Sequence, residues 1–289
     1  DTPFGADTPG RLVEAWHWLR TQAGTADDAM RGLWRDIRRA PFVYLLFAAL
    51  EVLLVARWRR VTPRFEHIAA QLVRIRTDRL AYTLETLART VLAGVRLGLP
   101  FAFVAWRLQA NQGVPFARAS ATGFAAVAVA AFVLSSAHAA GARSVSAESH
   151  FGWDRDELDR LGRLLFRFGV VLLPALWAVA ASEWYHDQTG ASVLGRVSFL
   201  VASGACALFA YAVLRRKRDT DGASRLSSPT AARFRMPALV ACLGVPIAGG
   251  VGSAFGYHYT AVRIAAWLVQ SVALVAAIGL LRPGCAPWP

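Results

Sequence analysis

The sequence predicts an all-α protein: a polytopic transmembrane helical bundle of about seven spans, with the N-terminus outside and the C-terminus in the cytoplasm. Three observations support this prediction. Hydrophobic residues account for 55% of the 289 residues and charged residues for only 18%, whereas soluble domains contain about 25% charged residues. The apolar residues are concentrated in seven continuous runs. The connections between these runs are alternately rich and poor in arginine.

The composition also excludes several classes of protein. With a mean hydropathy of +0.38, the chain is too apolar for a disordered or collagen-like protein, and this value argues against a soluble enzyme. The three cysteines, Cys206, Cys242 and Cys285, are far apart and form no CxxC pair. We therefore expect small buried thiols rather than a zinc site or a disulfide framework.

The apolar runs are long enough to cross a bilayer as helices. A hydrocarbon core about 30 Å thick requires about 20 mostly apolar residues in a helix that rises about 1.5 Å per residue. Barrel strands would alternate in polarity over about ten residues, but these runs are continuous. The predicted spans are residues 41–56, 80–106, 117–140, 164–184, 193–214, 237–257 and 261–281.

Basic side chains predict the orientation of the bundle. The connection after the first run carries seven arginines, and the connection after the fifth carries six arginines and Lys217. The connection after the third run is intermediate, and the others are poor in basic residues. Because arginine-rich loops stay in the cytoplasm, this alternation places the N-terminus outside. It also accounts for most of the net charge of +13 without a nucleic-acid partner.

Residues 1–40 differ from the rest of the chain. The first ten residues read as a loop, and residues 11–20 and 28–39 as short amphipathic helices with nearly balanced charge. We predict that residues 1–40 end an extracytoplasmic region, that residues 41–281 form the transmembrane domain, and that residues 282–289 form an irregular tail. Trp16, Trp18 and Trp34 fit either an interfacial aromatic belt or packing within the extracytoplasmic region.

Residues 58–79 form a basic amphipathic segment. One interpretation is a helix on the anionic inner leaflet, where each basic side chain contributes about 1 kcal/mol; the other is a helical hairpin linker leading into the second span. The candidate lipid-headgroup anchors lie in this segment and in the connection after the fifth span, and they are Arg59, Arg60, Arg64, Arg215, Arg216 and Arg218.

No motif predicts catalysis or metal binding. The chain contains no HExxH, GxSxG, Walker-type glycine loop or GxGxxG, and its six histidines are scattered. We therefore predict no enzymatic activity, no cofactor and no metal site. Gly249, Gly250 and Gly252 lie in an apolar run, where small residues let helices approach closely.

Among the charged residues inside the predicted spans, those farthest from the span ends are Glu51, Glu85, Arg89 and Arg96. Charges at mid-membrane are costly and often line an ion path. The alternative, which we favour, is that the second span begins later than residue 80, so that Glu85 and Arg89 lie at the interface and extend toward water.

Three segments of the sequence are more specific than the rest. The first combines Thr77-Asp78-Arg79 and Tyr82-Thr83-Leu84 with Leu97-Gly98-Leu99-Pro100; the second is Ser149-His150-Phe151-Gly152-Trp153, and the third is Phe255-Gly256-Tyr257-His258-Tyr259-Thr260. In this order they resemble the inner-membrane region of large MscS-like mechanosensitive channels of the MscK (KefA) and MscM types, and the third departs from the family pattern at His258. The candidate family-motif residues are Asp78, Arg79, Pro100, His150, Phe151, Trp153, Gly256, Tyr257, Tyr259 and Thr260.

The resemblance covers residues 30–281 and implies the outer membrane helices of a channel that releases ions under osmotic stress. Nothing after Leu281 resembles the pore helix or the β-containing vestibule of that family. We therefore expect a pore-less membrane domain that senses tension or scaffolds the channel, in the bacterial inner membrane. The alternatives are a stand-alone membrane bundle or remnant without transport activity, and a small transporter. The expected partners are the lipid bilayer and, if a pore domain is joined, further copies of the chain, with no nucleic acid or small-molecule substrate.

Overall fold

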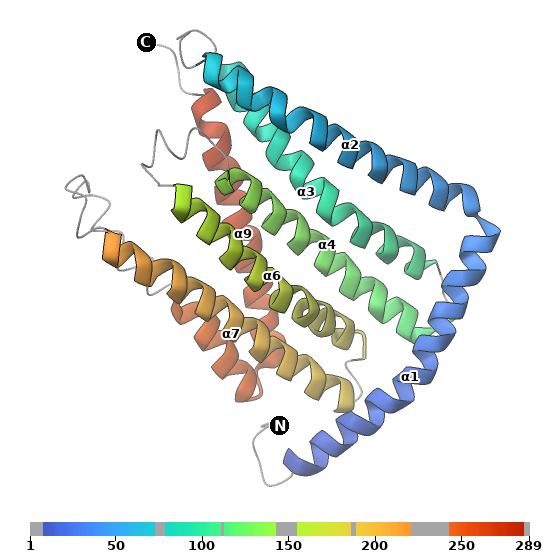
Figure 1. Cartoon of the computed structure of the whole chain (residues 1–289). Helices are drawn as coiled ribbons and strands as arrows, with labels where there is room; N and C mark the ends of the chain where they lie inside the picture. The colour runs from blue at the N-terminus through green and yellow to red at the C-terminus, as the bar shows by residue number, and fades with distance from the viewer. Residues whose placement is uncertain are drawn as a thin grey trace. The chain divides into compact units, whose positions relative to one another are not determined.

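A computed structural model describes residues 8–72, 79–110, 113–142, 155–185, 189–220 and 243–285. All regular structure in these residues is helical, which confirms the all-α fold class (Figure 1). The chain divides into two compact units. Unit 1 comprises Asp1–Gln22 and Arg163–Ser271, and unit 2 comprises Ala23–Gly162 and Val272–Pro289.

The first helix, α1 (Thr8–Arg39), is continuous over 32 residues. The two short helices expected in this region are therefore parts of one element. The helix ends with Arg38 and Arg39 in its last turn, where basic side chains favour the negative end of the helix dipole. Ala40 is not helical, because a residue that precedes proline is pushed out of the α region, and the chain turns there into α2.

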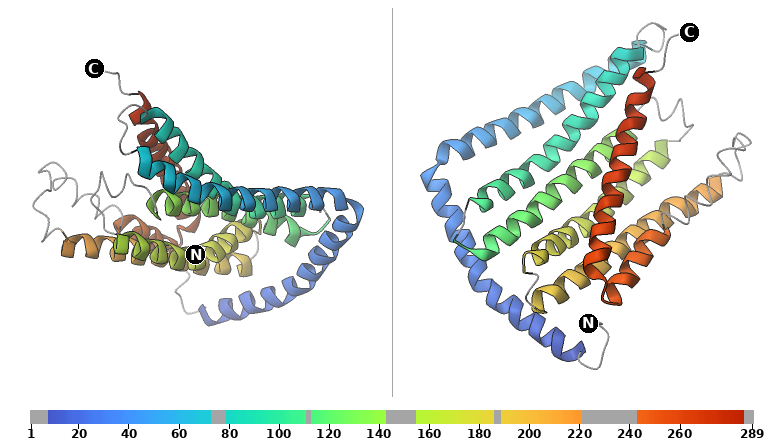
Figure 2. Two further views of the ribbon diagram at one scale, coloured as in Figure 1. Left: turned by 45° about the horizontal axis from the view of Figure 1, so that its top comes forward. Right: turned by 180° about the vertical axis from the view of Figure 1, so that it is seen from behind.

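Unit 2 contains α2 (Pro41–Leu72), α3 (Arg79–Gln109) and α4 (Pro115–Ala142). Helices α3 and α4 pack along each other, and α2 lies against α3, as the views in Figures 1 and 2 show. Helix α2 continues from its apolar part to Leu72 without a break. This continuity favours the hairpin-linker interpretation of the basic segment over a separate helix on the leaflet surface.

Unit 1 is formed by most of α6 (Arg155–Glu183), by α7 (Thr189–Thr220), by a shorter helix (Leu243–Ala254) and by the first half of α9 (His258–Cys285). Val179 of α6, Phe199 of α7 and Ala261 of α9 form a small buried cluster. Pro174 lies inside α6, and Pro100 lies inside α3. Each proline removes one hydrogen bond from its helix.

Five helices in the described residues are long and apolar enough to cross a membrane. Their apolar parts are Pro41–Trp58, Ala88–Gln109, Pro115–Ala139, Asp159–Glu183 and Ala191–Val213. The second predicted span lies within α3 (Arg79–Gln109), and the residue at which it begins stays a prediction. Of the sixth predicted span, residues 243–257 are described, and Leu243–Ala254 of these form an apolar helix. The total of seven spans and the orientation of the termini stay predictions.

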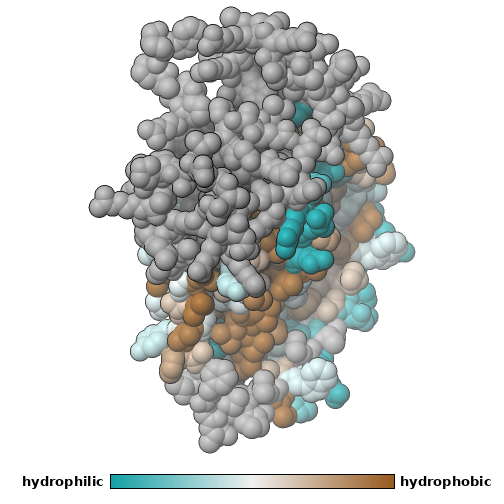
Figure 3. All heavy atoms as spheres, turned by 60° about the vertical axis from the view of Figure 1, so that its left-hand side comes forward, coloured by the Kyte–Doolittle hydropathy of each residue, from teal (hydrophilic) through white to brown (hydrophobic). Residues whose placement is uncertain are grey.

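Apolar side chains cover much of the described surface. On the face drawn in Figure 3, hydrophobic residues lie exposed in a broad patch. In α2, Phe42, Leu45 and Leu46 are 82%, 65% and 74% exposed. Such surfaces are unfavourable in water and suit a lipid environment.

Candidate functional site

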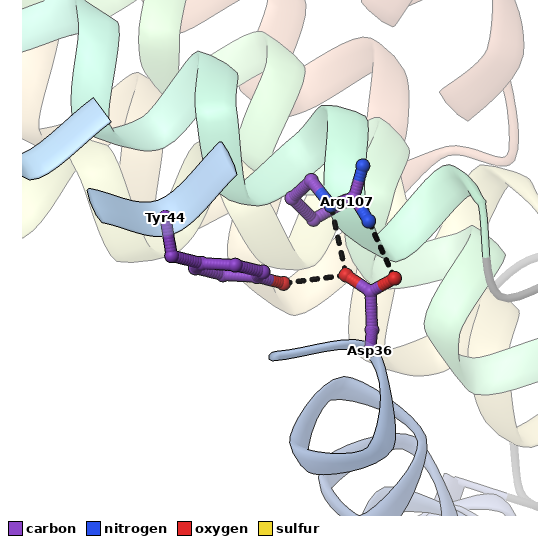
Figure 4. Close-up of polar contacts among 3 residues, drawn as sticks. All are labelled: Asp36, Tyr44 and Arg107. Carbon is purple, nitrogen blue, oxygen red and sulfur yellow. Dashed lines mark hydrogen bonds and ion pairs between the residues drawn. The ribbon is translucent and has the colours of Figure 1, made fainter. Parts of the chain in front are cut away.

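The junction of α1, α2 and α3 is built around the carboxylate of Asp36. Its Oδ2 atom accepts hydrogen bonds from Tyr44 Oη at 2.6 Å and from Arg107 Nε at 2.8 Å. Its Oδ1 atom accepts a further hydrogen bond from Arg107 Nη2, so the guanidinium binds the carboxylate through two parallel bonds (Figure 4). This geometry is among the strongest that side chains form. We call these three residues the junction cluster.

The junction cluster is largely shielded from solvent. The side chain of Arg107 is 12% exposed and that of Asp36 is 25% exposed. Burial acts to raise the pKa of Asp36, but the hydrogen bonds from Arg107 and Tyr44 and the positive charge of Arg107 outweigh burial, so the pKa lies below its ordinary value. The carboxylate is therefore ionised at neutral pH and holds the ends of three helices together.

Aromatic side chains extend the junction cluster along α2 and α3. Tyr44 meets Phe103 edge to face at 5.3 Å, and Phe47 stacks on Phe103 at 3.9 Å between ring centroids. The guanidinium of Arg107 lies over the ring of Trp106 at 4.8 Å. Aromatic pairs of this kind each contribute about 0.5–1.5 kcal/mol beyond the burial of their area. The start of α2 is thus attached to α3 by apolar as well as charged contacts.

A small apolar core lies beside the junction cluster. Ala29 of α1 and Leu108 of α3 are buried against Ala117 and Ala121 of α4. Alanine at these positions lets α1 lie close to the ends of α3 and α4. The second half of α1 is therefore fixed both by an ion pair and by packing.

The first half of α1 makes its own contact within unit 1. Trp18 meets the ring of Tyr185, just after α6, at 5.3 Å and edge to face. The hydroxyl of Tyr185 donates a hydrogen bond to Gln22 Oε1 at 3.3 Å. Trp16 and Trp34, by contrast, are each 56% exposed. Of the three tryptophans singled out from the sequence, one packs and two remain available to an interface.

Helices α3 and α4 approach each other closely at two glycines. A Cβ atom at Gly94 would lie 2.3 Å from Ser136 Oγ and 2.7 Å from the Phe132 ring, and one at Gly98 would lie 2.8 Å from the Ala128 carbonyl oxygen. The two glycines are four residues apart and so lie on one face of α3. This is the small-xxx-small pattern of closely packed membrane helices.

Serine hydroxyls link the same two helices. Ser135 Oγ donates a hydrogen bond to the Ala93 carbonyl at 2.8 Å, and Ser136 Oγ donates one to the Thr90 carbonyl at 3.1 Å. Hydrogen bonds between membrane helices contribute about 0.6 kcal/mol each. Together with the glycine contacts, these bonds hold α3 and α4 as one rigid hairpin.

Two ionisable residues of the spans face each other between α2 and α3. Glu51 of α2 is close enough to Arg96 of α3 for electrostatic attraction, and the Arg96 guanidinium lies over the Trp58 ring at 5.4 Å. Glu51 Oε1 and Arg96 Nε have no hydrogen-bond partner among the described residues, so the attraction between the two charges acts without a direct bond through these atoms. Arg89 lies in α3, and its place at the membrane interface stays a prediction.

A turn joins the helix Leu243–Ala254 to α9 in unit 1. Gly256 has a φ of 101°, which only glycine adopts without strain. Ser253 Oγ and His258 Nδ1 lie 2.9 Å apart across this turn, and Ser253 is fully buried. Burial and the positive charge of Arg196 lower the pKa of His258 to about 4, so this imidazole is neutral at physiological pH.

These features can be compared with known proteins. The family described as mechanosensitive ion channel inner membrane domain 1 matches residues 41–283. The chain belongs to this family. No curated protein and no solved structure matches it. The matched part of this mechanosensitive channel membrane domain begins at Pro41, so Asp36 lies just before it and Tyr44 and Arg107 lie within it.

Of the three family motifs of this channel domain, the third is described over its whole length, from Phe255 to Thr260. Gly256, Tyr257, Tyr259 and Thr260 lie at the turn and the start of α9, and the rings of Tyr257 and Tyr259 are 69% and 66% exposed. Pro100 lies in α3, two residues after Gly98, and Arg79 is the first residue of α3. Asp78, His150, Phe151 and Trp153 lie outside the described residues.

The candidate headgroup anchors are placed only by their backbone. Arg59, Arg60 and Arg64 continue α2, and Arg215, Arg216 and Arg218 lie near the end of α7. Their side chains lie outside what the structure describes, so their role stays a prediction. The sequence analysis did not identify the junction cluster or the Gly94–Gly98 pair. The four-residue spacing of the glycines was the available signal for the pair.

Proposed function

We propose that this chain is the tension-responsive part of an MscS-like mechanosensitive channel in the bacterial inner membrane, with no enzymatic activity. The observation that carries the proposal is a contrast within unit 2. None of the Pro41–Trp58 part of α2 is buried, whereas 39% of the Pro115–Ala139 part of α4 is buried. Helix α2 therefore packs more lightly than α4 does, although Tyr44 and Phe47 contact Phe103 of α3.

Tension thins a bilayer, and a helix that is then too long for the hydrocarbon core responds by tilting. The associated cost is fractions of a kcal/mol per Å of mismatch for each helix. A lightly packed α2 tilts more easily than the α3–α4 hairpin. The junction cluster holds the start of α2, so tilting becomes rotation about a fixed end. Summed over several helices and subunits, this energy can bias an equilibrium between two states.

A distance measurement tests this mechanism directly. Spin labels at Val52 of α2 and Val129 of α4, both exposed, report the position of α2 relative to the hairpin. Labels at Leu97 of α3 and Val133 of α4 serve as the matched control. In a variant without the native cysteines, we expect the first distance to change between thick and thin bilayers while the second stays constant. Equal behaviour of the two pairs would contradict the proposal.

The passage of ions through the chain is tested separately from its response to tension. We propose that the outer membrane helices sense tension or scaffold a channel and that the pore is supplied by a further segment, with several copies of the chain assembled around it. Patch recording of the purified chain in liposomes tests this part. Tension-gated current from this chain alone would contradict the pore-less assignment, whereas silence together with the α2 movement supports a sensing role.

A further inference from the structure

A cavity of about 150 Å³ lies beside the junction cluster, between the end of α1 and the end of α3. Arg35, Arg39 and Arg107 line it together with Asp36, and uncharged residues form the rest of its wall, namely Gly32, Leu33, Leu108 and Ala110. Three cations and one anion give the lining a formal charge of +2. The cavity lies within unit 2.

The carboxylate of Asp36 is bound by Arg107 through two hydrogen bonds, and Arg39 interacts with Asp36 only through its charge. Arg35 and Arg39 are exposed, and within the described ranges neither forms an ion pair with an acidic side chain. The Nε atom of Arg35 donates a hydrogen bond to the backbone carbonyl oxygen of Arg31 at 3.4 Å. One guanidinium group can donate two parallel hydrogen bonds to the oxygens of a phosphate group. The net positive charge of the cavity lining therefore complements a phosphate anion.

The position of the cavity along the spans points to the same chemistry. Arg107 lies two residues before the end of the apolar Ala88–Gln109 part of α3, and Arg39 lies two residues before the start of Pro41–Trp58. The exposed rings of Trp34 and Trp106 lie on the same two helix ends. Tryptophan gathers at the level of lipid headgroups, which is also the level of lipid phosphates.

We propose that this cavity binds a phosphate group, carried by an anionic phospholipid or by a free phosphate anion, through Arg35, Arg39 and the Asp36-bound Arg107. Helix-end capping alone would also place arginines in the last turn of α1. Capping, however, requires neither a cavity nor the convergence of an arginine from α3. The inference needs the membrane location of the family but not tension sensing, so it can fail or hold independently of the proposed function.

The test uses the full chain with Arg35→Gln and Arg39→Gln combined. The matched control combines Arg31→Gln and Arg38→Gln, which remove the same charge from the same part of α1 without lining the cavity. Native mass spectrometry counts phosphatidylglycerol and phosphatidylcholine bound to each protein. A second arm measures the thermal shift produced by inorganic phosphate in detergent.

We expect the cavity variant to bind phosphatidylglycerol at least about tenfold more weakly than the wild type, while the control variant and phosphatidylcholine binding change little. A wild-type response to phosphatidylglycerol alone identifies a lipid ligand, and a response to inorganic phosphate alone identifies a free anion. Equal losses in both variants, or no loss in either, would overturn the proposal. If the double variant does not fold, two other experiments test whether the cavity binds phosphate. Arg39→Gln alone should weaken the binding of phosphatidylglycerol, and inorganic phosphate should compete with phosphatidylglycerol for the wild-type protein. The absence of both effects would overturn the proposal.

Discussion

Arg107, near the end of α3, holds the carboxylate of Asp36 across 71 positions of the chain through two hydrogen bonds. Asp36 belongs to α1, outside the part of the chain that matches the channel family, and Arg107 belongs to a span within it. The ion pair therefore ties a preceding helix to the membrane domain. Tyr44 brings the start of α2 into the same contact.

Removal of the Asp36 carboxylate would leave the guanidinium of Arg107 without its partner. We expect Asp36→Ala to lower the free energy of unfolding by about 2 kcal/mol. Breaking a fully buried ion pair costs about 3–5 kcal/mol, but both side chains of this pair are partly exposed, so the loss should be smaller. Tyr44→Phe removes one hydrogen bond to a charged group and should cost about 1.5 kcal/mol. Unfolding in mixed detergent micelles measures both values.

Asp28→Ala is the matched control for this prediction. Asp28 forms an ion pair with Arg31 at 2.9 Å, but its side chain is 57% exposed and that of Arg31 is 68% exposed. Exposed pairs contribute less than about 1 kcal/mol. Comparable losses for Asp28→Ala and Asp36→Ala would show that the junction cluster has no special role.

The apolar spans could be predicted from the sequence, but the junction cluster could not. Hydropathy sums over about 20 residues, so a first span of 41–56 was expected, and the described part Pro41–Trp58 is helical and apolar enough to cross a membrane. Arg107 carries no comparable signal, because in the sequence it is one charge in a connection poor in arginine. Its partner is chosen by the packing of α1 against α3, which no local pattern encodes.

The glycines of α3 give a prediction with an internal control. A Cβ atom at Gly98 would meet the Ala128 backbone oxygen at 2.8 Å, and backbone cannot move aside cheaply. We expect Gly98→Ala to destabilise the α3–α4 hairpin by about 1–2 kcal/mol, since overpacking costs about 1–3 kcal/mol and the gain in helix propensity offsets up to about 1 kcal/mol.

Gly204→Ala in α7 is the control for this prediction, because nothing lies within 4 Å of a Cβ placed there. This substitution should be neutral or slightly stabilising. Thermal unfolding in detergent compares the two variants. A stabilising Gly98→Ala would mean that α3 and α4 are not in close contact.

From the sequence, the glycines expected to let helices approach closely were Gly249, Gly250 and Gly252. Gly249 and Gly250 make only ordinary contacts, with the nearest atoms at 3.7 Å and 3.5 Å from the added Cβ, and Gly252 has none within 4 Å. Glycine content alone does not locate an interface. Gly94 and Gly98 mark an interface because their shared face of α3 meets residues of α4, whereas Gly252, four residues before Gly256, meets nothing within 4 Å.

The lowered pKa of His258 predicts that the stability of unit 1 depends on pH. Its pKa is about 4 in the folded chain, against 6.5 for an ordinary histidine, so the unfolded chain binds more protons between these values. The contribution to stability is fully present above pH 6.5 and is lost as the pH falls to about 4. Unfolding measured at intervals from pH 7 to pH 4 should show this decline.

The variant His258→Gln removes the titrating group and should flatten the decline in that pH range. Asp36→Asn is the contrasting control, because the lowered pKa of Asp36 places its effect below pH 3.8. An unchanged slope in His258→Gln would assign the acid sensitivity to other groups.

The orientation of the bundle can be measured by labelling of single cysteines. In a chain without native cysteines, we expect Gly113→Cys, between α3 and α4, to react with a membrane-impermeant maleimide on intact cells. Arg218→Cys, near the end of α7, should react only after permeabilisation, because arginine-rich connections stay in the cytoplasm. The junction cluster would then face the exterior, together with the phosphate cavity. Labelling of Arg218→Cys on intact cells would reverse the orientation, and it would place both sites at the inner leaflet.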